Sequence, residues 1–225
     1  MPVPGNSEPP ATASLRERKK ARTRAALIEV SQRLFAERGY AATTLEAICA
    51  EVEVTVPTLL RYFPSKAALA NAPVSEAVTP LLDRLEDVDR TRSALESWTR
   101  FVAWEAGELA KPSSDIAQSY LRNLREFGRR ADRDPEVVAA GDAIQRQVQT
   151  ALAAALAADA AAPPDDLHSM LVASLLVQGR LSVYERWLAR DRLDESVVDD
   201  QMAVIDYAVQ SLPRRSAGRL QSIAK

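Results

Sequence analysis

Between Thr44 and Lys66 the side chains have the types and spacing to bind a second molecule. Thr44 and Thr55 can each cap a short helix through the hydroxyl group. In the second helix Leu59 and Phe63 recur four residues apart and form one apolar face. A guanidinium group can donate to the O6 and N7 atoms of guanine, and apolar groups can contact a thymine methyl group. The remaining face of the second helix offers both kinds of group: Val56, Pro57, Leu60, Arg61 and Tyr62.

The elements that position these side chains are two short helices joined by a tight turn. The apolar pattern of the first helix breaks at residues 52–54, and Pro57 falls in the first turn of the second, where a missing N–H costs nothing. Pro64 ends the second helix, because a proline disfavours the helical conformation of the residue before it. This is the shape of a helix-turn-helix, in which the second helix lies in the DNA major groove. Corners between helices in ordinary helical proteins share this shape. The neighbouring sequence is therefore needed to distinguish a DNA-binding helix-turn-helix from such a corner.

A stretch of about 55 residues around these helices carries further motifs in a fixed order. Together they resemble the N-terminal domain of the TetR family of bacterial transcriptional regulators. The resemblance covers only the first third of the chain. Its matching pieces are Ala26-Leu27-Ile28, Leu34-Phe35, Gly39-Tyr40, Thr43-Thr44-Leu45, Ile48-Cys49, Val54-Thr55, Thr58-Leu59, Arg61-Tyr62-Phe63 and Pro64-Ser65-Lys66.

The resemblance implies roles for individual residues. The exposed face of the recognition helix would meet base edges, while Tyr62, Lys66 and the helix N-terminus at Thr44 would reach phosphates. Three features depart from the family pattern: Glu53 replaces a common turn glycine, Leu60 replaces a common tyrosine, and the apolar start at Val56-Pro57 is poor in hydrogen-bonding groups. The implied DNA-binding set is Thr44, Thr55, Val56, Pro57, Thr58, Leu60, Arg61, Tyr62 and Lys66.

Charge is spread unevenly along the chain, whose net charge is −2. Residues 1–66 hold ten basic and seven acidic residues, net +3, whereas residues 67–225 are net −5. A local basic arm on an acidic protein suggests a polyanionic partner at one end, although a solvated disordered tail would have a similar composition. The basic residues concerned are Arg16, Arg18, Lys19, Lys20, Arg22 and Arg24.

Periodicity predicts an all-α protein with a three-helix DNA-binding domain over residues 15–66 and a larger helical ligand-binding and dimerisation domain over residues 67–212. Residues 1–14 read as a disordered leader and residues 213–225 as a disordered basic tail. Gly179 within a long helix suggests a close contact between helices. Helices are expected at about 16–38, 67–87 (interrupted by Pro73 and Pro80), 91–111, 113–130, 134–162, 165–190 and 194–212.

Aromatic residues of the second domain could line a pocket for a small apolar or amphipathic effector, which the resemblance favours over ordinary core packing. The predicted pocket set is Trp98, Phe101, Trp104, Tyr120, Leu124, Phe127, Leu171 and Tyr184.

A homodimer is expected, because one recognition helix spans too few base pairs and two-fold dimers match palindromic operators. The resemblance implies that the last two helices pair across the two-fold axis as a four-helix bundle. The predicted interface set is Leu175, Leu176, Val183, Trp187, Val198, Met202, Ile205 and Val209.

Composition limits the other classes of protein. With Cys49 as the only cysteine and His168 as the only histidine, neither an intrachain disulfide nor a metal site is expected, and no cofactor motif is present. The sequence shows no signal peptide and no apolar run of membrane-spanning length, which predicts a cytoplasmic protein. An enzyme is disfavoured, because neither a nucleophile motif nor a phosphate-binding loop occurs. The remaining alternative is a helical small-molecule-binding protein with weak or no specific DNA binding.

Overall fold

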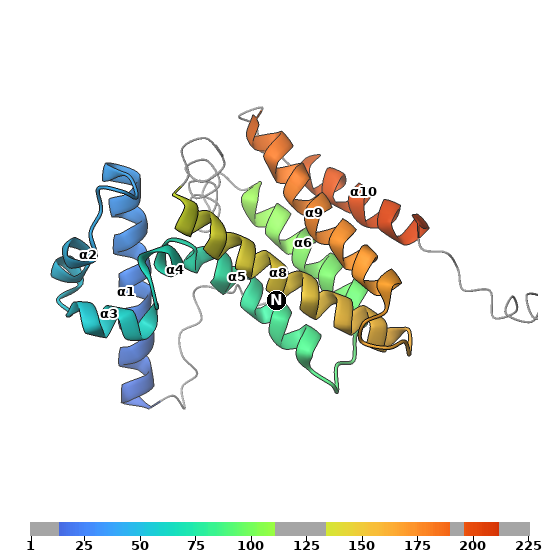
Figure 1. The fold of residues 1–225 in the computed structure, drawn as a ribbon, viewed down its shortest axis with the longest axis horizontal. Coiled ribbons are helices and arrows are strands. Elements are labelled where there is room, and N and C mark those ends of the chain that lie inside the picture. Colours follow the sequence, from blue (N-terminus) through green and yellow to red (C-terminus); the bar gives the residue numbers. More distant parts are fainter. Residues whose placement is uncertain (1–13, 111–133, 190–195, 212–225) are drawn as a thin grey trace, which may run out of the picture.

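A computed structural model of the protein describes residues 14–110, 134–189 and 196–211, which form helices and loops without a strand (Figure 1). The helices gather into a small N-terminal group, α1 to α3, and a larger bundle built from α5, α6, α8, α9 and α10. No helix within these ranges is long and apolar enough to cross a membrane.

The N-terminal group consists of α1 (Leu15–Arg38), α2 (Leu45–Val52) and α3 (Val56–Tyr62). Ser14 begins α1 with a capping box: its hydroxyl accepts from the backbone N–H of Glu17, and the Glu17 carboxylate accepts from the N–H of Ser14. The basic segment is therefore the first part of a regular helix, in agreement with the helix expected at about residues 16–38.

The connection between the two groups is a pair of helices, α4 (Lys66–Ala70) and α5 (Ala72–Glu86). The break falls at Asn71, which places Pro73 in the first turn of α5, where its missing N–H is harmless. Pro80 lies inside α5. The sequence allowed either one kinked helix or two pieces, and the structure has two pieces.

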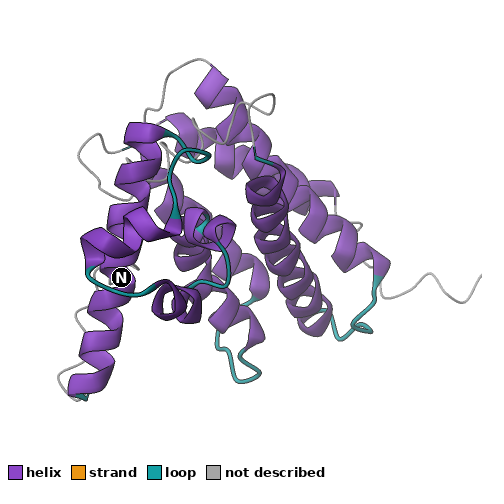
Figure 2. Cartoon of the chain, turned by 60° about the vertical axis from the view of Figure 1, so that its left-hand side comes forward, coloured by secondary structure: helices purple, strands orange, loops and turns teal. Residues whose placement is uncertain are grey.

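The larger bundle contains α6 (Ala94–Leu109), α8 (Pro135–Asp159), α9 (Leu167–Ala189) and α10 (Ser196–Ser211) (Figure 2). Helix α8 packs against α5, α6 and α9, and α10 packs against α6 and α9. The helix expected at residues 113–130 lies outside the described residues.

Apolar side chains from all of these helices form the main core of the bundle. Trp98 and Phe101 of α6 are buried there with Leu152 of α8, Leu176 of α9 and Ile205 of α10. Two residues expected at a dimer interface, Leu176 and Ile205, are thus committed to the core of one chain.

Gly179 marks the closest approach between α9 and α10. A Cβ atom on Gly179 would lie only 2.5 Å from Cγ1 of Val204, which is closer than two carbon atoms can pack. The close helix contact expected at this glycine is confirmed.

Candidate nucleic-acid interface

The turn between α2 and α3 is fixed by local hydrogen bonds. Thr44 Oγ1 accepts from the N–H of Ala47 at 3.1 Å, and Thr55 Oγ1 accepts from the N–H of Thr58 at 3.4 Å. Each threonine therefore caps its helix as the sequence predicts. The two hydroxyl groups of Thr55 and Thr58 also lie 3.0 Å apart, within hydrogen-bonding distance.

Glu53 occupies the position of the expected turn glycine without changing the type of turn. Its φ and ψ angles are 56° and 43°, in the left-handed region, and it forms the C-cap of α2. A residue with a Cβ atom adopts this conformation at a cost of about 1–2 kcal/mol. The α2–α3 turn thus retains the left-handed geometry that glycine would adopt. The replacement of glycine by Glu53 strains the backbone and leaves the shape of the turn unchanged.

Helix α3 has one face in the core and one face in solvent. Leu59 and Phe63 are buried with residues of α1 and α2, as their spacing predicts. Pro57, Leu60 and Arg61 are exposed. The exposed face thus combines one cation with two apolar side chains, and it can offer both hydrogen-bond donors and methyl contacts to base edges.

The basic residues of α1 divide into two groups. Residues Arg16 to Arg22 are exposed on the first turns of α1, which project past α3 (Figure 1). Arg24 instead pairs with Glu76 of α5, and its guanidinium carbon lies 4.7 Å from the centre of the Phe63 ring. Burial lowers the pKa of Arg24. Arg24 therefore connects α1, α3 and α5 and does not belong with the exposed cations.

Lys66 is also engaged within the protein. Its Nζ atom donates to the carbonyl oxygen of Thr43 at 2.7 Å and lies 4.1 Å from the centre of the Tyr40 ring. Burial lowers the pKa of Lys66, opposed by the carboxylates of Asp134 and Glu136. A phosphate contact by Lys66 would have to share the ammonium group with these partners.

Cys49 is a core residue of the same domain. Its side chain is buried between the helices, and burial raises the pKa of the thiol, with a further contribution from Glu46. A raised thiol pKa disfavours the reactive thiolate, so Cys49 acts as a small apolar side chain here.

The sequence of this domain matches that of known proteins. Residues 27–72 match the family described as "Bacterial regulatory proteins, tetR family". The N-terminal domain belongs to the TetR family. The "HTH-type transcriptional regulator TcmR" of Streptomyces glaucescens is 39% identical over 84 residues, which cover 37% of this chain and 37% of TcmR.

Solved structures extend the TetR-type fold to the second domain. SmeT, the repressor of the Stenotrophomonas maltophilia multidrug efflux pump SmeDEF, has a TM-score of 0.60 at 19% identity, covering 86% of this chain and 91% of SmeT. Thermus thermophilus FadR in complex with lauroyl-CoA has a TM-score of 0.57 at 18% identity, covering 87% of this chain and 97% of FadR. At these identities the likeness concerns the fold.

The predicted effector pocket is only partly brought together. Trp98, Phe101 and Tyr184 are buried, and Trp104 packs against the core that contains Trp98 and Phe101, whereas Tyr184 belongs to a second apolar cluster. Leu171 is 60% exposed on α9, so its assignment to the pocket was wrong. The other three members of the predicted set, Tyr120, Leu124 and Phe127, lie outside the described residues.

The predicted dimer residues are divided between core and surface. Leu176, Trp187 and Ile205 are buried within one chain, so they offer little surface to a partner. Val198 and Met202 are half-buried against the core, and Val209 is exposed.

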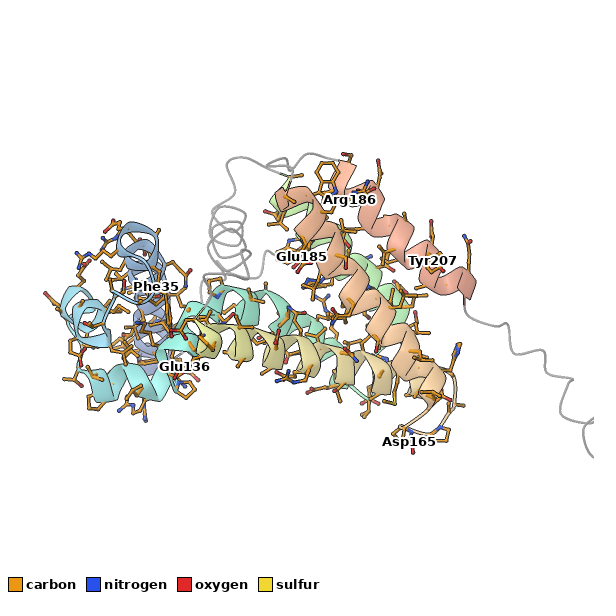
Figure 3. The ribbon with its side chains drawn as sticks, turned by 45° about the horizontal axis from the view of Figure 1, so that its top comes forward. Phe35, Glu136, Asp165, Glu185, Arg186 and Tyr207 are labelled. Atoms are coloured by element: carbon orange, nitrogen blue, oxygen red, sulfur yellow. The ribbon has the colours of Figure 1, made fainter. Side chains whose placement is uncertain are left out.

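A surface groove between α9 and α10, with a volume of about 380 Å³, contains the two remaining predicted residues, Leu175 and Val183. Tyr207, which is 66% exposed, lines the same groove and was missed by the sequence analysis. Figure 3 shows Arg186 on α9 and Tyr207 on α10, at the end of the molecule away from α1 to α3. The other lining residues are Gly179, Ser182, Asp200, Ala203 and Val204.

Proposed function

We propose that this protein is a dimeric, ligand-released transcriptional repressor of the bacterial cytoplasm that binds a palindromic DNA operator. The exposed face of α3 carries the proposal: two capped helices and a left-handed turn hold Pro57, Leu60 and Arg61 outward on a rigid scaffold. The TetR-family match of the same residues supports this interpretation.

In the proposed complex, α3 lies in the major groove and α1 runs beside the phosphate backbone. Arg61 donates to a guanine, while Val56, Pro57 and Leu60 contact thymine methyl groups. Few hydrogen-bonding groups are available on α3, so much of the affinity comes from phosphates and is salt-dependent.

Arg61→Ala should weaken operator binding by about 1–3 kcal/mol and relax the base preference at one position of each half-site. The loss follows from removing the only basic residue in the sequence of α3. Titrations of the operator and of single-base variants would measure it, with Arg100→Ala on α6 as a control of equal charge change. An equal loss on every DNA sequence would reassign Arg61 to a phosphate.

Lys19→Gln together with Lys20→Gln should weaken binding to any DNA sequence and reduce the salt slope of log K by about 0.9 for each phosphate that the protein no longer neutralises. Both side chains are exposed on α1, and replacement leaves the capping box at Ser14 intact. Fluorescence anisotropy at several salt concentrations would test this. An unchanged slope would show that the first turns of α1 do not touch DNA.

We place the dimer contact at the groove between α9 and α10. The groove offers Leu175, Val183 and Tyr207 on two antiparallel neighbours, and a two-fold axis through it would create a four-helix bundle. The effector would bind in the larger bundle and favour one separation of the two recognition helices over the other. Two proteins of this fold have been solved with ligands, SmeT with triclosan and FadR with lauroyl-CoA.

Selection of bound sequences from a random duplex pool tests the proposal as a whole. A palindromic motif is expected, because two copies of α3 would contact equivalent half-sites. If no motif is enriched at moderate salt, the alternative of a helical small-molecule-binding protein without specific DNA binding takes its place. The replacement of the family tyrosine by Leu60 is the feature that would then explain the result.

A further inference from the structure

A cluster of polar side chains is buried inside the apolar bundle, between α6, α9 and α10. Glu105 is 4% exposed and Gln201 is 1% exposed, and Arg180 and Tyr184 are buried with them. Buried polar groups are stable only where hydrogen bonds replace those made with water. The bonds within the cluster therefore show which groups still require a partner.

The hydrogen bonds of the cluster leave two oxygen atoms without a donor among the described residues. Tyr184 donates its hydroxyl to Glu105 Oε2 at 2.8 Å, and Arg180 Nη1 lies 3.5 Å from the same oxygen. Gln201 Nε2 donates to the carbonyl oxygen of Arg180 at 3.1 Å. The other oxygen of each side chain, Glu105 Oε1 and Gln201 Oε1, is buried and accepts no hydrogen bond from the part of the chain that the structure describes.

An aromatic surface adjoins the polar cluster. Phe101 precedes Glu105 by one helical turn of α6, and its ring centre lies 5.7 Å from the guanidinium carbon of Arg180. The Phe101 ring also neighbours Trp98 at 6.0 Å and Trp104 at 6.2 Å between ring centres. Two oxygen atoms that accept no hydrogen bond from the described residues, Glu105 Oε1 and Gln201 Oε1, thus belong to a cluster that adjoins a row of aromatic rings.

We propose that Glu105 and Gln201 recognise the effector, and that the effector is a neutral aromatic molecule carrying hydroxyl or N–H donors. Its donors would fill Glu105 Oε1 and Gln201 Oε1, and its rings would pack against the aromatic row beginning at Phe101. This inference rests on the proposed function in one respect, namely that the larger bundle binds an effector.

The charges of the cluster favour a neutral molecule. Arg180 already provides a cation beside Glu105, so a cationic effector would place a second positive charge next to the guanidinium group. An anionic effector would instead face the carboxylate. Coulomb interactions are poorly screened in a buried site, and each of these like-charge contacts would be costly. A neutral donor forms the missing hydrogen bond without either cost.

Naphthol and its methyl ether form a matched pair of probes for the native protein, because they differ in the presence of a hydroxyl donor. Naphthol should bind about 10- to 100-fold more tightly than methoxynaphthalene. Naphthylmethylammonium and naphthoate should bind more weakly than naphthol. Calorimetry would measure all four affinities. Equal affinity for naphthol and its ether, tighter binding of either ion, or no binding of any probe would overturn the proposal.

Glu105→Gln should remove most of the preference for naphthol over its ether. The side-chain amide nitrogen of glutamine cannot accept a hydrogen bond, and it can occupy the position of Glu105 Oε1. Val102→Ala on the same helix loosens the same core and keeps both acceptors, so the preference should persist. Gln201→Met offers a second test of the acceptor pair if Glu105→Gln does not fold. A preference unchanged in a folded Glu105→Gln or Gln201→Met variant contradicts the proposal.

Operator binding separates failure of this inference from failure of the proposed function. The native protein should bind its selected DNA motif whether or not naphthol binds. Specific DNA binding without a preference for naphthol overturns the effector assignment alone, whereas absence of any DNA motif overturns the regulator proposal.

Discussion

Tyr207→Glu should convert the protein to monomers and lower its affinity for a palindromic operator by on the order of 100- to 10,000-fold. A two-fold interface repeats every substitution, so two new carboxylates would be brought together in the proposed α9–α10 contact. The two half-sites would then be bound by separate monomers, without the gain in affinity that linkage gives. Sedimentation analysis would measure the mass, and titration of the full and half operators would measure the affinity.

Val88→Glu provides the matched control, because Val88 is also an exposed apolar residue and lies on the loop after α5, away from the groove. This variant should remain dimeric and bind DNA as the native protein does. A Tyr207→Glu protein that stays dimeric would place the interface elsewhere on the surface. If the Val88→Glu variant were also monomeric, an added charge anywhere on the surface would be sufficient to dissociate the dimer.

The sequence did not predict which side of α9 faces the core. Apolar residues occur around much of this helix, so Leu175 and Leu176 could not be distinguished by periodicity. In the structure Leu176 is buried in the core and Leu175 lines the groove. The packing partners of α9 are α8 and α10, and which residues of α9 meet them depends on the tertiary arrangement of the helices. The same difficulty applies to Trp187 and to Ile205 of α10, which are also buried within one chain.

Local signals, in contrast, predicted the helix ends and the core face of α3. Capping by Thr44 and Thr55 involves residues three positions away, so the sequence contains all the information needed. The roles of Arg24 and Lys66 depend on partners from other elements, and both were predicted only as DNA contacts. The hydrogen bond between Tyr184 and Glu105 joins residues that are 79 positions apart, which no short motif could reveal.

The contact between the two domains could not be predicted from local sequence patterns either. It involves the start of α8. Val137 of α8 is 2% exposed and belongs to the core of the DNA-binding domain, with Phe35 and Leu69. Asn71 Nδ2 donates to the carbonyl oxygen of Val137 at 3.0 Å. Figure 3 shows Glu136, the preceding residue, beside the helix that carries Phe35. A movement of α8 would therefore reach the DNA-binding domain directly.

Val137→Asp should destabilise the protein by about 3–5 kcal/mol and abolish operator binding, because it buries an uncompensated charge in the core beneath α1. Ala139→Asp adds the same charge two residues later on the exposed side of α8, and it should have little effect. Urea unfolding followed by circular dichroism would measure stability, and anisotropy would measure DNA binding. If both variants unfold alike, α8 does not support the DNA-binding domain. The larger effect for Val137 would instead identify α8 as the element through which an effector in the bundle can move α1 and α3.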